Sequence, residues 1–311
     1  MLKRLRRTAK NQLKITVREA RNLDPVTLYH YTSSRGLVGI IENRELWFSD
    51  VRFLNDSQEF KHFCDMVENS IRSQSAKYRQ SWIERGCKDV FFDAMVRNLC
   101  SGCRSDSMFQ WASKYGHPFV FSLSGERDSL SQWRAYGNGE YCIGFDIEKL
   151  CRIRDFSLLK IDYSEPRGQT SLSGMIDWFF EKHFQDIRSD GSIDPEVFYS
   201  GLDDMLSKSK ADDFLRNKDA AFKSENESRL VVYKSINDEQ VFFDPTGRCP
   251  IPRIKVKSIN GQDAILDAIV EIICGPGADI ERSEAAIRLM GQRTTQHSFI
   301  VTSSKVPYRS N

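Results

Sequence analysis

The sequence predicts an α+β fold, and three observations lead to this prediction. Short segments rich in β-branched and aromatic residues, which favour strands, occur near both ends of the chain and in its middle. The longer stretches between them repeat apolar residues at helical spacing, so the strands frame helical insertions and do not alternate regularly with helices. No GxGxxG or Walker-type loop is present, which leaves a Rossmann or P-loop fold with little support.

Each expected strand is a run of strand-forming residues between turn formers. Short helices are predicted over Ser129–Tyr136, where the Gly137–Gly139 stretch gives a stop signal, and over Ser283–Met290. The expected strands are Tyr29–Thr32, Leu46–Ser49, Pro118–Ser124, Glu140–Phe145, Leu158–Tyr163, Ser228–Tyr233, Arg253–Val256, Ile269–Cys274 and Ser298–Thr302.

The first expected strand leads directly into a helix. After the polar Ser33-Ser34 break, Leu37, Ile40 and Ile41 follow at the spacing of one helix face. Either serine can cap this helix by accepting a hydrogen bond from its free N–H groups. Such a capped N-terminus favours negative charge, so the corner is a candidate nucleotide site, although many such corners bind nothing.

The chain is expected to contain one domain and one arm. Residues 1–24 are predicted to form a basic N-terminal helical arm, since Lys and Arg dominate its charged positions. Two interpretations of this arm stay open: a solvated helix packed on the body, or an arm that contacts phosphate backbones or a partner protein. Residues 25–311 are predicted to form a single α+β catalytic domain with helical insertions at about 60–116 and 165–222.

Composition limits the function classes. The 40% hydrophobic and 11% aromatic residues suffice for a core, while a net charge of +2 gives no global argument for nucleic acid or a membrane. The eight cysteines are scattered and no apolar signal core precedes them, so we expect reduced thiols in the cytoplasm. Cys100 and Cys103 lack a second pair or a nearby histidine, which makes zinc a weak hypothesis. The sequence contains no apolar run of about 20 residues, so it predicts no membrane span.

Short motifs add a family resemblance. The segment Leu28–Thr32, followed by Gly36-Leu37 and Ile40-Ile41, resembles the first conserved block of bacterial ADP-ribosyltransferases of the His-Tyr-Asp/Glu type. The chain is also similar to an uncharacterised bacterial family with the blocks His-Tyr-Thr, Asn-Asp-x-x-Glu, Trp-x-x-Tyr and Glu-x-Glu-x-Arg. In this sequence the four blocks are His30–Thr32, Asn55-Asp56 with Glu59, Trp133 with Tyr136, and Glu225–Arg229.

The resemblance to the transferases implies a split β-sheet core, mixed or antiparallel, and NAD as a substrate. It also implies roles for the aromatic and polar side chains. His30 would hydrogen-bond the adenosine-side ribose of NAD, with Thr32 beside it, because an imidazole both donates and accepts. Tyr136 would stack on the nicotinamide ring, and Trp133, one helical turn earlier, would line the same pocket.

The same resemblance gives the chemistry to a carboxylate. Glu227 would stabilise the oxocarbenium-like state in which the nicotinamide–ribose bond breaks. Glu225 would orient the acceptor or act as a base, and strand alternation would align it with Glu227 if both lie on one strand. Arg229 would hold these carboxylates or the diphosphate. Ser122 or Ser124 would contact the carboxamide of NAD, and the register of this block stays unsettled.

Ordinary structural roles remain open for all of these residues. A Glu-x-Glu-x-Arg pattern on an amphipathic strand is often only its solvated face. Trp133 and Tyr136 are typical core residues of a helix face, and His30 alone would be a satisfied polar side chain. The order His, Ser with aromatic residue, then Glu along the chain is what favours the catalytic hypothesis.

Two groups of candidates have no assigned role. The block Asn55, Asp56 and Glu59 is either a structural helix cap or an additional catalytic or acceptor-binding group. Arg134 is a further candidate for contact with the diphosphate, without a defined place.

The leading hypothesis is therefore a cytoplasmic NAD-dependent ADP-ribosyltransferase, acting as a toxin or anti-phage defence effector on a nucleic-acid or protein acceptor, with an antitoxin as a possible partner. Two other function classes stay open. One is a non-catalytic module that binds a nucleotide or a partner protein. The other is a nuclease-like enzyme in which Asp56, Glu59, Glu225 and Glu227 would hold Mg²⁺.

Overall fold

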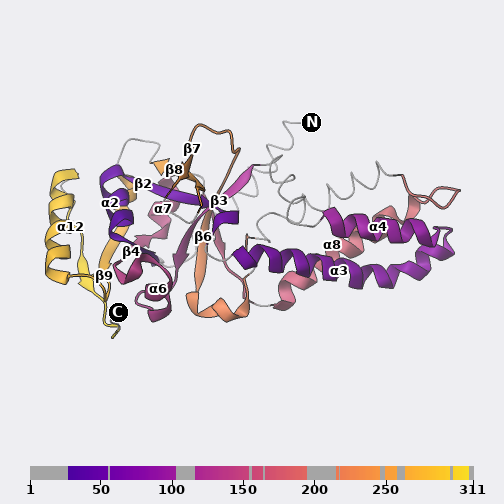
Figure 1. The fold of residues 1–311 in the computed structure, drawn as a ribbon, viewed down its shortest axis with the longest axis horizontal. Helices are drawn as coiled ribbons and strands as arrows, with labels where there is room; N and C mark the ends of the chain where they lie inside the picture. Colours follow the sequence, from indigo (N-terminus) through magenta and orange to yellow (C-terminus); the bar gives the residue numbers. More distant parts are fainter. Residues whose placement is uncertain are drawn as a thin grey trace.

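A computed structural model of the chain shows a sheet-based body from which long helices extend (Figure 1). The N-terminal arm predicted over residues 1–24 lies outside the part of the chain that the structure describes. The described residues are 27–54, 57–102, 116–153, 156–163, 165–194, 215–216, 218–245, 249–257, 263–294 and 297–307.

Ten strands are found among the described residues, and each expected strand overlaps one of them. The strand β7 was not predicted; it lies at the sheet edge and pairs only with β8. The strands are β1 (Thr27–Thr32), β2 (Glu45–Asp50), β3 (His117–Ser124), β4 (Tyr141–Asp146), β5 (Ser157–Lys160), β6 (Glu227–Lys234), β7 (Val241–Asp244), β8 (Ile251–Lys257), β9 (Ile269–Cys274) and β10 (Val301–Ser303).

These strands form one large sheet with the order β10-β9-β4-β1-β3-β2-β8-β7, to which β6 and β5 are added through β3. The pair β9 and β10 is parallel, and the other pairs are antiparallel. The structure is therefore a mixed α/β fold on a large, open, mixed sheet, which agrees with the predicted fold class at this coarse level.

The sheet branches at β3. β6 pairs with all eight residues of β3 and so occupies one of its two edges along the whole length. β1 and β2 must then share the other edge: β2 pairs with Phe119 and Val120, and β1 pairs only with Ser124. The β3 residues between these contacts have no ladder partner in β1 or β2. The two halves of the sheet therefore separate at this point.

Helices on one face of the sheet complete the main core. Leu37, Ile40 and Ile41 on α2 are buried in it, as the sequence predicts, and the Ser33 side chain accepts from the N–H of Gly36 as the N-cap. The helices that contribute buried residues to this core are α2 (Ser34–Asn43), α7 (Ile147–Ile153), α11 (Ala264–Asp267) and α12 (Ile280–Thr294).

The opposite face carries two smaller apolar clusters. One packs Trp133 of α6 (Leu130–Ala135) against Tyr29 and Tyr31 of β1. The other joins Val120 of β3 and Val231 of β6. Both faces of the sheet are thus buried in part by apolar contacts.

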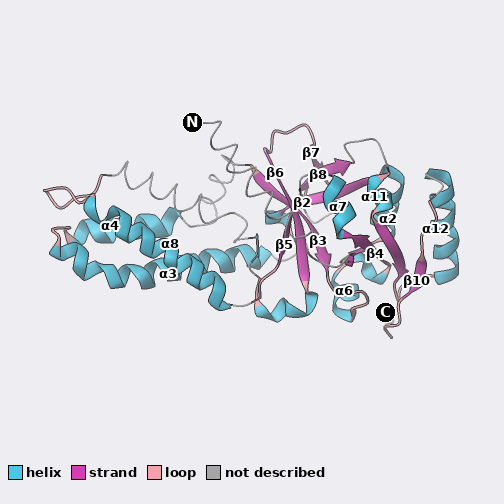
Figure 2. Cartoon of the chain, turned by 180° about the vertical axis from the view of Figure 1, so that it is seen from behind, coloured by secondary structure: helices cyan, strands magenta, loops and turns pink. Residues whose placement is uncertain are grey.

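The long helices have a core of their own. α3 (Ser57–Glu84), α4 (Asp89–Gly102) and α8 (Glu165–Lys182) pack together and extend away from the sheet (Figures 1 and 2). Trp82 and Phe92 are buried there against Phe179 and Phe180. α3 and α4 occupy most of the range 60–116 predicted as a helical insertion, and α8 occupies the first third of the range 165–222. None of the helices in the described part of the chain has the apolar length that a membrane span requires.

Candidate functional site

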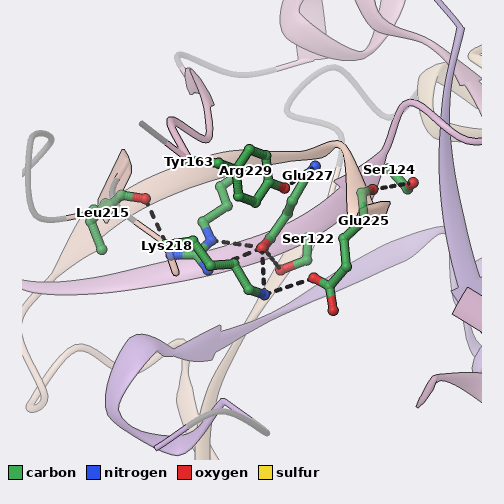
Figure 3. Close-up of polar contacts among 8 residues, drawn as sticks. All are labelled: Ser122, Ser124, Tyr163, Leu215, Lys218, Glu225, Glu227 and Arg229. Atoms are coloured by element: carbon green, nitrogen blue, oxygen red, sulfur yellow. Dashed lines mark hydrogen bonds and ion pairs between the residues drawn. The ribbon is translucent and has the colours of Figure 1, made fainter. Parts of the chain in front are cut away.

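Glu227, the first residue of β6, lies at the centre of a buried polar cluster (Figure 3). Its carboxylate accepts a hydrogen bond from Ser122 Oγ at 2.9 Å. Arg229 donates to the same carboxylate from Nε at 2.7 Å and from a terminal nitrogen at 3.1 Å. Arg229 is 2% exposed, and so its planar guanidinium is committed to Glu227 inside the protein. Of the two roles predicted for Arg229, the structure has it hold a carboxylate.

Lys218 joins the two glutamates. Its ammonium donates to Glu225 at 2.7 Å and to Glu227 at 3.0 Å. Glu225 ends the short helix η4 (Ala220–Glu225), and Asn226 turns the chain with φ of 45° before β6 begins. The condition for alignment by strand alternation, that both glutamates lie on one strand, is therefore not met. The shared lysine brings their carboxylates together instead.

The charge state of Glu227 follows from these partners. Burial by itself would raise the pKa of its carboxyl group, because a charge loses its hydration inside the protein. The attraction of Arg229 and Lys218 outweighs that cost and lowers the pKa of Glu227 to about 2. The carboxylate is consequently ionised at neutral pH, with both oxygens held in place.

Neighbouring groups fix the backbone around this carboxylate. The N–H of Glu227 donates to the hydroxyl of Tyr163 at 2.7 Å, and burial raises the pKa of that phenol to about 12. Ser124 donates its hydroxyl to the carbonyl of Glu225 at 2.6 Å and accepts from the N–H of Glu126 at 3.0 Å. Ser124 therefore shapes the loop, whereas Ser122 contacts the candidate catalytic carboxylate.

His30 and Glu227 belong to opposite faces of the sheet. Residues paired across neighbouring strands point to the same side, and Tyr29 pairs with Ser124, which pairs with Glu227. His30, next to Tyr29 along β1, therefore points to the other side. There its ring stacks on the ring of Phe121, with the two ring centroids 4.2 Å apart.

Ser122 connects the two. The imidazole Nδ1 of His30 lies 3.0 Å from the carbonyl oxygen of Ser122, and the hydroxyl of the same serine donates to Glu227. This contact joins β1 to β3 at the point where the sheet branches. His30 and Glu227 are thus linked through one residue, although their side chains start on different faces.

The surroundings of His30 include a cation from the far half of the sheet. Burial lowers the pKa of His30 to about 4, and the charge of Arg253 on β8 adds to this effect, while the hydrogen bond to Ser122 opposes it. Arg253 donates to Ser49 Oγ at 2.8 Å and pairs with Asp244 at 3.0 Å. Burial lowers the pKa of Arg253, and the charge of Arg35 in the first turn of α2 lowers it further. Two cationic groups, Arg253 on β8 and Arg35 on α2, therefore lie near one another.

The predicted aromatic wall, Trp133 and Tyr136, packs on the cluster around Tyr29 and Tyr31. Trp133 is fully buried, donates its indole N–H to Asp128 at 2.7 Å and stacks edge-on against Tyr31. Tyr136 follows α6 and is half-buried beside the same cluster, and Arg134 is exposed. Trp133 is thus a core residue of the face that also carries Glu227.

The α2 corner is already bound to a carboxylate. The backbone N–H and the hydroxyl of Ser34 both donate to Glu140. Thr32 is buried at the end of β1, and a side chain at Gly36 would meet its Oγ1 at 2.0 Å, so only glycine permits this approach. The N-terminus of α2 therefore already binds a negative charge of the same chain, the carboxylate of Glu140.

The block between β2 and α3 contributes little that can be placed. Asn55 and Asp56 lie outside the described residues, and Glu59 lies in α3 without a described side chain. Among the described residues no group of three His, Cys, Asp or Glu side chains is arranged to hold a metal ion. The ammonium of Lys218 lies between Glu225 and Glu227, where the predicted Mg²⁺ would have to bind.

Three residues of this site were missed from the sequence: Lys218, Tyr163 and Arg253. Lys218 and Tyr163 come from segments joined only in the fold, where the N–H of Lys218 donates to the carbonyl of Asp162. No spacing in the sequence marks these contacts. Arg253 lies on a predicted strand, and its alternation with buried Ile254 was the one available signal that it faces away from the core.

Comparison with known protein families gives a match over part of the chain. A family described as "Protein of unknown function (DUF2971)" matches residues 132–230, about a third of the chain. This range contains two of the four quoted blocks, Trp133 with Tyr136 and Glu225–Arg229, and ends within β6. Neither the curated proteins nor the solved structures give a match. Residues 132–230, including Glu227 and most of its ligating side chains, are therefore similar to a family whose function is unknown.

Proposed function

We propose that this protein is an NAD-dependent ADP-ribosyltransferase in which Glu227 is the catalytic carboxylate. The observation that carries the proposal is a buried, ionised carboxylate beside the branch of the sheet. Ser122, Arg229 and Lys218 hold it in one orientation. A fixed negative charge of this kind stabilises the positive charge that develops on a ribose when its glycosidic bond breaks.

The proposed reaction uses this charge in a defined order. The bond between the ribose C1′ and the nicotinamide nitrogen breaks, and neutral nicotinamide leaves with the bonding electrons. Glu227 stabilises the resulting oxocarbenium-like ribose and accepts a hydrogen bond from its 2′-hydroxyl. A nucleophile of the acceptor, or water, then bonds to C1′ and releases its proton.

The basic groups near the branch suit the other half of NAD. In this proposal Arg253 and Arg35 attract the diphosphate, because Arg35 is exposed and Arg253 keeps 23% of its side-chain exposure beside Asp244. Arg229 is only 2% exposed and is enclosed with Glu227. His30, which keeps partial exposure at the branch, contacts the adenosine-side ribose. Trp133 has no direct role in the reaction, since its side chain is enclosed.

Nicotinamide release from NAD by the full chain tests this proposal. We expect Glu227→Gln to lower release by at least about a hundredfold, the typical effect of losing a charge-stabilising group. Glu148→Gln, on the half-exposed surface of α7, removes an equal charge and should leave the rate unchanged. Because Glu227→Gln removes a carboxylate that two buried cations share, Ser122→Ala serves as a second variant that keeps the charge and loosens the carboxylate.

Each outcome decides between the function classes. Release that persists in Glu227→Gln would remove the catalytic assignment. NAD binding without turnover by the unmodified chain would favour a non-catalytic nucleotide-binding module. Nucleic-acid cleavage with Mg²⁺ and no NAD would favour the nuclease hypothesis.

A further inference from the structure

The face of the sheet that carries Arg253 continues along β8 into a group of aromatic and cationic side chains. We call this group the aromatic–lysine patch; it consists of Trp47, Phe242, Lys255 and Lys257. The register places its members on one face, because Trp47 pairs with Lys255 and Phe242 pairs with Arg253, two residues before Lys255. The patch therefore begins beside the branch of the sheet and runs along β2, β8 and β7.

The side chains of the patch contact one another directly. The rings of Trp47 and Phe242 meet edge-to-face with centroids 5.1 Å apart. The ammonium of Lys255 lies 5.3 Å from the centroid of the Trp47 ring and 4.9 Å from that of Phe242. Such an arrangement keeps a cation and two π-surfaces together at a half-exposed site.

The patch carries an excess of positive charge. Within the part of the chain that the structure describes, Lys255 and Lys257 face a single carboxylate, that of Glu45, at 3.6 and 3.5 Å. Glu45 is buried and also accepts from the indole N–H of Trp47 at 2.8 Å. The side chains of Lys255 and Lys257 keep 44% and 65% of their exposure, so both ammonium groups reach solvent. One buried carboxylate thus anchors the tryptophan and leaves one lysine charge in excess.

We propose that the aromatic–lysine patch binds single-stranded nucleic acid. Unpaired bases stack on aromatic rings, and lysines neutralise the phosphates between them, a combination that does not depend on base sequence. A protein partner fits less well, because lysine is depleted in the centres of protein–protein interfaces. That the bound nucleic acid is also the acceptor of ADP-ribose rests on the proposed function. That the patch binds single-stranded nucleic acid does not.

Fluorescence anisotropy without NAD tests the proposal with the full chain. The probes are labelled single strands of about 12 nucleotides, as DNA and as RNA, an abasic strand of equal length and the matching duplex. We expect both single strands to bind more tightly than the abasic strand and the duplex. The ratio of the affinities for single-stranded DNA and single-stranded RNA then identifies which nucleic acid the patch prefers.

Two variants separate stacking from charge. Phe242→Leu should weaken binding of the single strands about tenfold and leave the abasic strand unaffected. Lys257→Gln should reduce the dependence of log affinity on log salt by about 0.7, the value for one phosphate contact on a single strand. Lys149→Gln, on α7 across the sheet, is the matched control and should change neither quantity.

Equal affinity for the single strand and the abasic strand would overturn the proposal, as would unchanged binding by both patch variants. These measurements contain no NAD, so a failure to bind leaves the nicotinamide-release experiment intact. Binding with no nicotinamide release would in turn retain the patch and reject the transferase.

Discussion

At the scale of the residue, the structure holds two titratable side chains in fixed protonation states on either side of Ser122. His30 is kept neutral by burial, and Glu227 is kept ionised by Arg229 and Lys218. In both groups the folded pKa lies below its ordinary value, so below that value the unfolded chain binds more protons than the folded one. Both groups therefore contribute stability at neutral pH that is lost in acid.

The two losses occupy different pH ranges. Stability from His30 is complete above its ordinary pKa of 6.5 and falls as the pH approaches about 4. Stability from Glu227 is complete above 4.5 and falls as the pH approaches about 2. Measurements above pH 4.5 consequently report on His30 without Glu227.

We predict that His30→Gln flattens the acid side of the stability curve. The glutamine cannot titrate, so the free energy of unfolding should fall less between pH 6.5 and pH 4.5 than in the unmodified chain, by about 1–3 kcal/mol. Urea unfolding at several pH values in this range measures the difference. An identical fall in both proteins would show that His30 does not titrate as its burial implies.

The residue scale also shows what the sequence predicts about the site. Arg229 was predicted to hold the carboxylates or the diphosphate, and its contact with Glu227, two residues away in the same strand, is present. The contribution of Lys218 was not predicted, because it depends on the turn at Asn226 and on a contact with Asp162. Contacts within a strand follow from its periodicity, whereas contacts between distant segments do not.

At the scale of the element, strand positions were predictable and strand partners were not. Local runs of strand-forming residues predict β1, β2 and β3 individually. The sharing of one β3 edge by β1 and β2 arises from long-range pairing, which local propensity does not determine. The branch, on which the proposed NAD site depends, is therefore a property of topology.

The helices α3, α4 and α8 give a prediction of their own, because their core is separate from that of the sheet. Trp82 is fully buried among Phe92, Phe180 and Phe184. Replacing it with alanine should destabilise these helices by about 3–5 kcal/mol through the cavity it leaves. Hydrogen exchange should accelerate in the three helices and stay slow in β3 and β6.

Phe48→Ala is the matched control for this experiment. Phe48 is equally buried but belongs to the main core, between Phe121 and Phe156. Its replacement should accelerate exchange in the sheet. If Trp82→Ala accelerates exchange in β3 and β6 as strongly as in the helices, the two cores unfold as one unit.

At the scale of the whole molecule, the end of the described chain is tied back to its middle. Asp128, in the loop before α6, accepts from Trp133 Nε1, from Ser304 Oγ and from the N–H of Lys305, each at 2.7 Å. Burial would raise the pKa of Asp128, but these hydrogen bonds lower it overall. Val306 packs on the cluster around Trp133. One carboxylate thus joins α6 to the segment after β10.

This junction predicts that two distant changes act on one interaction. Asp128→Ala removes the acceptor, and a chain that ends at Ser303 removes two of its donors. Each should lower the free energy of unfolding by about 1–3 kcal/mol, because buried polar partners lose their hydrogen bonds. The double variant should lose less than the sum by about 1 kcal/mol or more, since both changes break the same contacts. Urea unfolding of the four proteins measures this coupling, with Glu239→Ala in the exposed turn before β7 as a neutral control. Strict additivity would mean that the segment after Ser303 is held by its apolar contacts and not by Asp128.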